Sequence, residues 1–222
     1  MKTKKVISSI LLILLILNTT LILFLAPFRF YIFNENFYQK EFSNLDIYNK
    51  IPDADKRASD LINFFNDKST LDNQFYTQDE ISHLKDVKKL INKTIIFFYS
   101  SVFIEILLLT LLYHKSKVRF KKDIRRIFKT SSAVIIIVSL LIYLLSFKFD
   151  FLFTRFHRIF FPQGNWQFSA DSNLINLFPQ SFFYDFFYQT ILISAAISLL
   201  IFVSILLLSP TKKRKIKQLF SP

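Results

Sequence analysis

Two histidines carry the chemistry that this sequence could perform. His157 lies in the segment RFHRIFF (residues 155–161), and His83 lies in the segment HLKDVK (residues 83–88). Imidazole titrates near pH 6.5, so it can take up and release protons at physiological pH. The chain contains only three histidines and no cysteine, which removes disulfides and thiol nucleophiles from consideration. The sequence therefore suggests a general acid–base pair, provided that the fold brings the two imidazoles together.

Asp86 is a carboxylate close in sequence to His83. It follows His83 by three residues, so the two side chains would share one face of a helix and the carboxylate could orient the imidazole. An ordinary surface pairing with Lys89 or Lys93 explains this aspartate equally well. Each histidine also has a structural alternative, in which it is exposed or hydrogen-bonded and has no catalytic role.

Four further residues surround His157 in the sequence and are candidates for binding or support. Arg155 and Arg158 flank it and could bind a phosphate or polarise a carbonyl, or they could reach the headgroups as interfacial side chains. Trp166 is typical of a membrane-interface anchor, and Asp171 follows it. No dense ligand motif such as two histidines at i, i+4 is present, so we expect no metal site.

The elements that must position these residues are four long apolar runs, at about 6–28, 92–113, 130–149 and 184–209. Each is long enough to cross about 30 Å of hydrocarbon as a helix, whereas a lone strand would leave its backbone unpaired in lipid. The first run is too long for a secretory signal and is predicted to be a retained anchor. The sequence therefore predicts an all-α, four-span transmembrane helical bundle, a single integral membrane domain over residues 1–222.

The interiors of the four runs are poor in charge and in glycine. Glu105 is the one carboxylate in the interior of a run, and such a residue is either functional or hydrogen-bonded to a neighbouring span. The chain has a single glycine, Gly164. This leaves little room for close glycine-based crossings, and the spans are expected to pack through Leu, Ile, Phe and scattered Ser and Thr.

The net charge of +13 is distributed by membrane side. Sixteen of the 29 basic residues lie before span one, between spans two and three, or after span four, and only Asp123 opposes them. The positive-inside rule makes the segments 1–5, 114–129 and 210–222 cytoplasmic, in contact with anionic headgroups. Segments 31–91 and 150–183 are then extracellular and carry His83 and His157, whereas His114 falls on the opposite side. This distribution argues against a nucleic-acid partner.

Both extracellular segments are predicted to be partly helical. A helix is expected over 58–66, and the capping-box pattern TQDE (residues 77–80) predicts a helix that carries His83 into span two. The second segment is so rich in aromatic residues that it should lie in the membrane interface. The sequence PQGN (residues 162–165) marks a turn, and Asp171 or Ser172 could cap a short helix over 173–178 before Pro179 breaks it.

A resemblance to a known family gives these features a specific meaning. The segment FHRIFF (156–161), followed by Trp166, Asp171 and LINLFP (174–179), resembles the signature of the bacterial lipoprotein intramolecular transacylases (Lit). HLKDVK (83–88) resembles that family's second motif, and the chain length, the four spans and the placement of both motifs also agree. The resemblance covers most of the chain and implies a multi-pass enzyme of the bacterial cell membrane.

The reaction that the resemblance implies is an acyl transfer within one substrate molecule. The substrates are membrane lipoproteins whose N-terminal cysteine carries a diacylglyceryl group, and membrane lipids surround the enzyme. The sn-2 acyl chain moves to the α-amino group of the same cysteine and gives the lyso form. Because an ester becomes an amide, the transfer is downhill, and we expect no cofactor.

Within the resemblance, His157 is hypothesised to be the base or proton shuttle. His83, oriented by Asp86, would polarise the ester carbonyl and protonate the leaving oxygen, while Arg155 or Arg158 assists the oxyanion. An exchange of the two histidine roles and an acyl-histidine intermediate both stay open.

Other function classes fit the sequence less well. A non-enzymatic four-span accessory or sensor protein that binds a partner through its outer segments is the main alternative. A small transporter is disfavoured, because the spans are almost free of charge and show no pair of broken helices. No Gly-x-Ser-x-Gly elbow, P-loop or dinucleotide fingerprint supports a soluble-type hydrolase, kinase or dehydrogenase.

Overall fold

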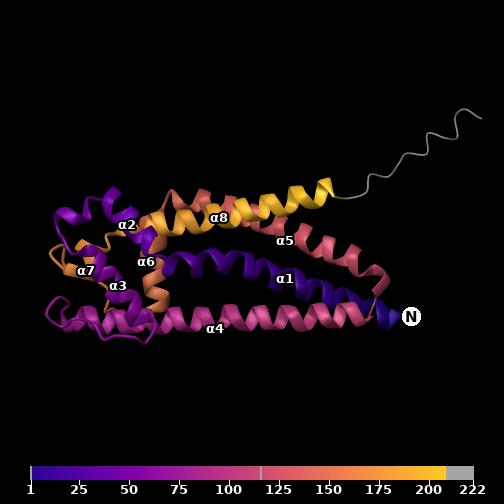
Figure 1. Ribbon diagram of the computed structural model, residues 1–222, viewed down its shortest axis with the longest axis horizontal. Helices are drawn as coiled ribbons and strands as arrows, with labels where there is room; N and C mark the ends of the chain where they lie inside the picture. Colours follow the sequence, from indigo (N-terminus) through magenta and orange to yellow (C-terminus); the bar gives the residue numbers. More distant parts are fainter. Residues whose placement is uncertain (1, 116, 209–222) are drawn as a thin grey trace, which may run out of the picture.

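Four long helices run along one axis of the computed structural model, which describes residues 2–115 and 117–208, the side chains of residues 2–7 excepted (Figure 1). They are α1 (Lys2–Ile32), α4 (Gln78–Lys115), α5 (Lys117–Ser146) and α8 (Gln180–Leu207). Each contains a stretch long and apolar enough to cross a membrane. The described part of the chain is helical without any strand, so the prediction of an all-α four-span bundle is confirmed.

The long helices do not stop where the apolar runs stop. Residues 114–129 were predicted to be a cytoplasmic connection. In the structure, α4 continues through Lys115 and α5 already begins at Lys117, so the described residues of this segment belong to the two helices. This segment is rich in Lys and Arg, which favour helix, and it contains no Gly or Pro to break one. At its other end α5 stops at Ser146, short of the predicted 149. The predicted basic tail, 210–222, lies outside the described residues.

Packing between the spans relies on small hydroxyl residues. Helix α1 lies against each of α4, α5 and α8, and α5 packs along α8. Small side chains let helix backbones approach closely in lipid, where no hydrophobic force drives the helices together. Several serine and threonine side chains in the described spans are at most 4% exposed, and they include Ser101, Ser131, Ser132, Ser139, Thr190, Ser194 and Ser198. The expected use of Ser and Thr in place of Gly is therefore confirmed.

Glu105 has a structural explanation. Its carboxylate accepts hydrogen bonds from Asn18 Nδ2 at 2.8 Å and from Thr19 Oγ1 at 2.7 Å. The same Asn18 amide also donates to the Ser101 carbonyl at 2.8 Å. These bonds tie α1 to α4 inside the apolar zone, so the structure supports the hydrogen-bonded alternative for this residue.

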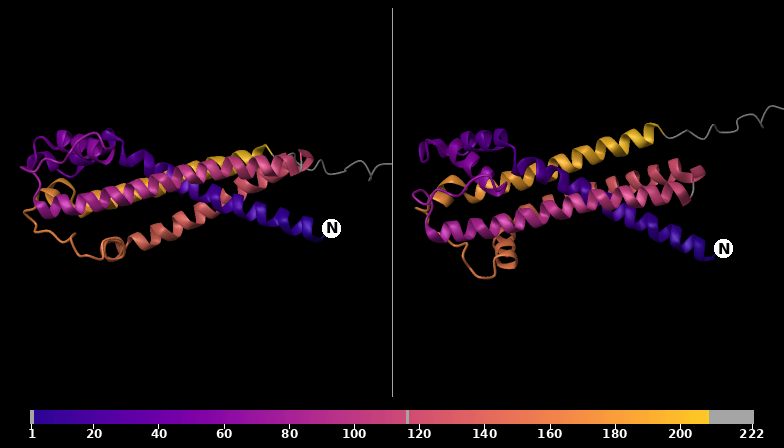
Figure 2. Two further views of the ribbon diagram at one scale, coloured as in Figure 1. Left: turned by 90° about the horizontal axis from the view of Figure 1, so that it is seen from below. Right: turned by 60° about the horizontal axis from the view of Figure 1, so that its bottom comes forward.

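The short elements gather at the end of the bundle opposite the N-terminus (Figures 1 and 2). They are α2 (Glu35–Asn44), the 3-10 helix η1 (Ile47–Asn49), α3 (Ala54–Phe65) and α7 (Asn173–Leu177). They share one apolar core with the first turns of α4 and α8, including Phe37, Tyr38, Phe42, Ile62, Leu84, Leu177, Phe178 and Phe182. The predicted helix over 58–66 corresponds to the second half of α3, whereas α2 had no sequence signal that we recognised.

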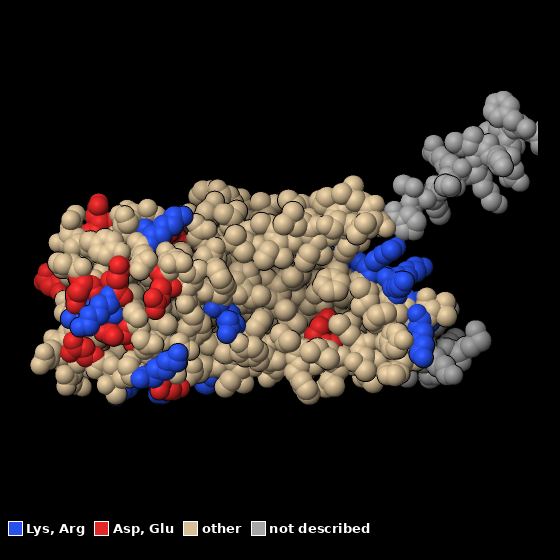
Figure 3. Space-filling model, viewed as in Figure 1, with Lys and Arg blue, Asp and Glu red and all other residues tan. Residues whose placement is uncertain are grey.

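Helix α6 (Phe149–Phe160) lies across the direction of the spans at the same end (Figure 1). It buries His157 but exposes Phe156, Ile159 and Phe160, as expected for a helix whose apolar side faces acyl chains. Helix α6 thus contains part of the aromatic segment predicted to lie in the interface, and the rest follows it in the sequence. In the view of Figure 3, charged side chains gather at both ends and are nearly absent from the middle, and those at the end nearer the N-terminus are basic.

Candidate active site

The N-terminal end of α4 carries one of the two histidines. The predicted capping box is confirmed, because Thr77 N donates to Glu80 Oε2 at 2.7 Å and Glu80 N donates to Thr77 Oγ1 at 3.3 Å. The helix of 38 residues is roughly 57 Å long at 1.5 Å per residue, far more than the ~30 Å of hydrocarbon. His83 therefore lies in an extension of α4 beyond its apolar stretch.

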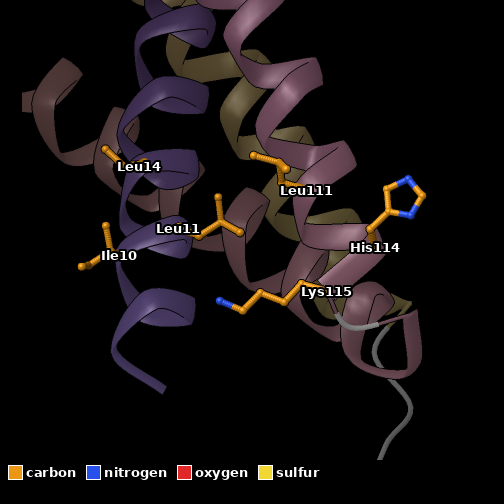
Figure 4. A pocket seen from close by; sticks show the side chains of 6 residues that line it. All are labelled: Ile10, Leu11, Leu14, Leu111, His114 and Lys115. Carbon is orange, nitrogen blue, oxygen red and sulfur yellow. The ribbon is translucent and has the colours of Figure 1, made fainter. Parts of the chain in front are cut away.

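The fold brings His83 and His157 together, although 74 residues separate them in sequence. Their ring centroids are 6.0 Å apart and their planes differ by 25°. Both rings are nearly enclosed, with exposures of 7% for His83 and 8% for His157. The third histidine, His114, lies exposed near the far end of α4, away from the pair (Figure 4).

Aromatic side chains surround the pair. Phe161, itself 2% exposed, contacts both rings, with centroids 4.8 Å from His83 and 5.6 Å from His157. Trp166 lies 4.8 Å from His157, and Phe168 lies 5.7 Å from His83. A site with such walls is poor in water, so hydrogen bonds and charges act more strongly in it than in bulk solvent.

The tautomer of His157 follows from its backbone contact. Its Nδ1 lies 2.8 Å from the carbonyl oxygen of Phe153, which can only accept a hydrogen bond. Nδ1 therefore carries the proton, and Nε2 of the neutral ring keeps a lone pair. Burial lowers the pKa of His157 below its ordinary 6.5, and the bond to Phe153 partly opposes this shift. His157 is thus a neutral base at physiological pH.

His83 is held neutral more strongly. Burial first, and the neighbouring His157 second, lower its pKa to about 4, while the negative charge of Asp86 acts in the opposite direction. Its Nδ1 is buried and has no hydrogen-bond partner among the described residues. A neutral imidazole always has one N–H group to donate. His83 can therefore serve as an electrophilic hydrogen-bond donor at neutral pH, without carrying a charge.

We expect the stability of the protein to fall when the pH is lowered from 7 to 5. Both imidazoles have a lowered pKa when folded, so below about pH 6.5 the unfolded chain binds protons that the folded chain does not. Apparent unfolding temperatures measured at intervals of half a pH unit would reveal this loss. The His83→Gln variant should show a shallower decline over the same interval; a decline identical to wild type would contradict the buried neutral state of His83.

The carboxylate of Asp86 is engaged with a loop rather than with His83. The loop of residues 161–172, here called the covering loop, connects α6 to α7 and carries Trp166 and Phe168 onto the two rings. Asp86 Oδ2 accepts from Gln163 Nε2 at 2.8 Å and from Asn165 Nδ2 at 3.0 Å. No hydrogen bond joins Asp86 to His83 in the described structure. Asp86 therefore does not orient the imidazole directly, as the sequence had suggested; its hydrogen bonds hold the covering loop instead.

The far end of the covering loop is fixed by Glu80. This side chain is 1% exposed, and its carboxylate accepts from the Ser172 hydroxyl and from Leu174 N, the latter at 2.9 Å. Burial opposes ionisation, but these bonds and those from Thr77 lower the pKa of Glu80. Ser172, one of the two predicted caps, also accepts from Ile175 N at the start of α7. Glu80 and Asp86 thus attach both ends of the covering loop to α4.

The Asp86→Asn variant tests this attachment. Hydrogen bonds to a charged group contribute about 1.5–3 kcal/mol, so the covering loop should open roughly 10- to 100-fold more often in the variant. Hydrogen exchange of the amides of residues 163–168 is the measurement. Lys89→Ala is the matched control, because Lys89 contacts only the other oxygen of Asp86, in an exposed ion pair at 2.9 Å that contributes little. Equal protection in wild type and Asp86→Asn would refute the attachment.

Three of the residues proposed from the sequence lie apart from the pair. Arg155 and Arg158 are exposed on α6, and the Arg155 guanidinium lies over the Phe151 ring at 5.1 Å. Asp171 is exposed in the covering loop. Among the described residues, no group of three or more His, Cys, Asp or Glu side chains is arranged to hold a metal ion.

Sequence reasoning missed part of the site. Glu80 was recognised only as a capping residue, although a capping carboxylate has a second oxygen free to bind elsewhere. Phe161 and Phe153 were counted among many interfacial aromatic residues. Phe153, at i−4, lies on the same face of α6 as His157, and Phe161, at i+4, directly follows the end of that helix; both spacings are a usable signal.

Comparisons with known proteins agree with this geometry. The family model described as lipoprotein intramolecular transacylase Lit matches residues 8–183. The solved structure of the membrane-integral lipoprotein intramolecular transacylase Lit from Bacillus cereus is similar with a TM-score of 0.75 and 18% identity, over 89% of this chain and 94% of that one. A variant of that protein with one histidine replaced by alanine is similar with the same TM-score and 16% identity, over 93% and 96% of the two chains. A search of curated protein sequences finds no match.

Proposed function

Because this chain belongs to the family of lipoprotein intramolecular transacylases, we propose that it moves the sn-2 acyl chain of a diacylglyceryl-modified lipoprotein to the α-amino group of the same N-terminal cysteine. It is a multi-pass membrane protein of an acyltransferase family. The observation that carries the proposal is the meeting of His83 and His157, at 6.0 Å between ring centroids, in an aromatic site at one end of the bundle.

The transfer requires one proton to leave nitrogen and one to reach oxygen. The α-amino nitrogen attacks the ester carbon, the carbon–oxygen bond to the glyceryl group breaks, and the amide bond forms. His157 Nε2, with its free lone pair, takes the proton from the attacking nitrogen and returns it to the departing glyceryl oxygen. The reaction is an isomerisation and needs no external reactant. We expect no cofactor.

His83 stabilises the charge that develops on the carbonyl oxygen. Its neutral ring donates an N–H hydrogen bond to the oxyanion of the tetrahedral intermediate, and in this dry site such a bond is strong. Each ring can form a hydrogen bond of about 3 Å in its own plane, so the two imidazoles can contact one acyl group placed at their nitrogen edges. Holding amine and ester of one molecule together in this way supplies the proximity that an intramolecular transfer exploits.

The orientation in the membrane follows from the charge distribution. The basic end of the bundle is cytoplasmic, with both chain termini, and the histidine end is extracellular in a bacterial cell membrane. Substrate lipoproteins then reach the site from the outer leaflet. Because the two imidazoles are almost fully covered, the covering loop opens to admit the ester. Arg155 and Arg158 hold α6 at headgroup level.

Mass spectrometry of lipoprotein N-termini tests the proposal. The chain is expressed in a bacterial strain that leaves its lipoproteins in the diacyl form, and N-terminal peptides are compared with those from the empty-vector strain. We expect conversion to N-acyl, monoacylglyceryl cysteine of unchanged total mass. Fragment ions distinguish this product from its isomer. Lipoproteins that stay in the diacyl form despite normal membrane levels of the chain would instead favour a non-enzymatic accessory protein.

A further inference from the structure

A shallow groove between α1 and α4 lies at the end of the bundle opposite the two histidines. Its hollow measures about 550 Å³ and is lined by Ile10, Leu11, Leu14, Leu111, His114 and Lys115. In Figure 2 the N-terminal part of α1 diverges from the other spans toward this end. The groove lies where α1 and α4 no longer fill the space between them.

The groove is apolar along its length and basic at its mouth. Leu11, 9% exposed, forms the floor, whereas Ile10, Leu14 and Leu111 are between 46% and 59% exposed and form the walls. Lys115 extends across the mouth toward α1, and the His114 ring points away from it (Figure 4). In the described structure no carboxylate forms an ion pair with Lys115.

The surroundings of Lys115 are basic as well. The next helix, α5, begins at Lys117, and the exposed residues of its first turns include Lys121, Lys122, Arg125, Arg126 and Lys129. Only Asp123 opposes them in this segment. A ligand at the mouth therefore gains most if it is negatively charged, and a lysine binds phosphate as a compact point charge.

We propose that this groove binds one phospholipid with an anionic headgroup, such as phosphatidylglycerol. One acyl chain lies along Ile10, Leu14 and Leu111 on the Leu11 floor, and the phosphate contacts the Lys115 ammonium. The apolar walls select a lipid over a free phosphate, and the bilayer supplies that lipid at the depth of the groove. The occupied groove fills the gap left by the divergence of α1 and joins α1 to α4 at the basic end.

A second hollow repeats this construction. It measures about 400 Å³ between α5 and α8, with apolar walls that include Phe128 and Leu200 and with Arg125 as its one basic residue. Two independent interhelical hollows at the basic end of the bundle thus combine acyl-sized apolar walls with a single cation. An apolar hollow with one cation at its mouth matches an acyl chain with an anionic headgroup, whereas direct packing between two spans would leave no such hollow.

Tryptophan quenching by brominated lipids tests the groove directly. The native Trp166 is replaced with phenylalanine, and Ile10→Trp places a reporter at the groove rim. The full chain is reconstituted in vesicles that contain brominated phosphatidylglycerol or brominated phosphatidylcholine. We expect a preference of about fivefold for the anionic lipid at this reporter, as one nearby lysine would provide. Ile106→Trp is the matched reporter and should show no preference, because Ile106 is exposed on α4 away from the face that carries Leu111 and lines neither hollow.

Charge variants on the reporter background decide the assignment. Lys115→Gln should abolish the preference at the groove reporter, whereas Lys122→Gln, an exposed lysine of α5 outside the groove, should leave it intact. Equal preference at both reporters, or its persistence in Lys115→Gln, would overturn the site and indicate diffuse attraction. Leu14→Trp provides a second reporter in the same groove if Ile10→Trp does not fold.

Discussion

The His157→Gln variant is expected to lose about 10²- to 10⁴-fold in the rate of lyso-form production, the usual contribution of general acid–base catalysis. Glutamine matches the size and polarity of histidine but has no lone pair that can accept a proton from an amine. The loss should therefore be equally large in His157→Ala. The measurement is the initial rate of N-acylation of a synthetic diacylglyceryl lipopeptide by the purified chain.

Folding must be separated from catalysis in this comparison. His157 packs against Phe153, Phe161 and Trp166, so its removal also disturbs the covering loop. Hydrogen exchange of the covering loop identifies any such disturbance. Lys85→Gln is the control for effects of expression and purification, because Lys85 is exposed on α4 beyond the apolar stretch. This variant should keep the wild-type rate. Retention of more than a tenth of the wild-type rate by a folded His157→Gln variant would remove His157 from the proton-transfer role.

His83 should respond differently to the same two substitutions. The loss of one oxyanion donor typically costs about 10²- to 10³-fold, and we expect His83→Ala to lie in this range. His83→Gln retains an N–H group that can reach toward the oxyanion, so it should recover a substantial part of the rate. Initial rates for the pair of variants, measured with the same lipopeptide, distinguish the two roles.

The outcome separates hydrogen-bond donation from proton transfer. If His83 transferred the proton itself, glutamine and alanine would be equally inactive, and the assignment of roles would have to be exchanged. In the His83→Ala, His157→Ala double variant, we expect a loss far smaller than the product of the two single losses, because groups that act as one unit are not additive. Independent, multiplicative losses would indicate that the two imidazoles do not act on one intermediate.

Local sequence signals were sufficient for the scaffold. The apolar runs are long and uninterrupted, so the four spans could be predicted from hydropathy alone, and the TQDE segment marked the start of α4 correctly. The sequence predicted only that both histidines lie on one side of the membrane, from their placement beside apolar runs and from the charge asymmetry; their proximity was left to the fold. Neither fact gives a distance, which depends on how α6 lies across α4.

The contacts that complete the site were beyond sequence reasoning because they join distant segments. Asp86 had a plausible local partner in His83, but its hydrogen bonds go to Gln163 and Asn165, more than 75 residues away. Glu80 reaches Ser172 and Leu174 over a similar separation. Such pairings are decided by the packing of the covering loop, and a single sequence contains no periodic pattern that encodes it.

The most direct test of the account is a crossover experiment with two synthetic lipopeptides. One carries a deuterated sn-2 chain and a heavy peptide, the other carries neither label, and both are mixed in nanodiscs with the purified chain. The account predicts that each N-acyl chain stays with its own peptide, and that the His157→Gln variant forms at least about 100-fold less product. Deuterated chains on light peptides, or transfer at the wild-type rate without His157, would contradict an intramolecular transfer driven by the histidine pair.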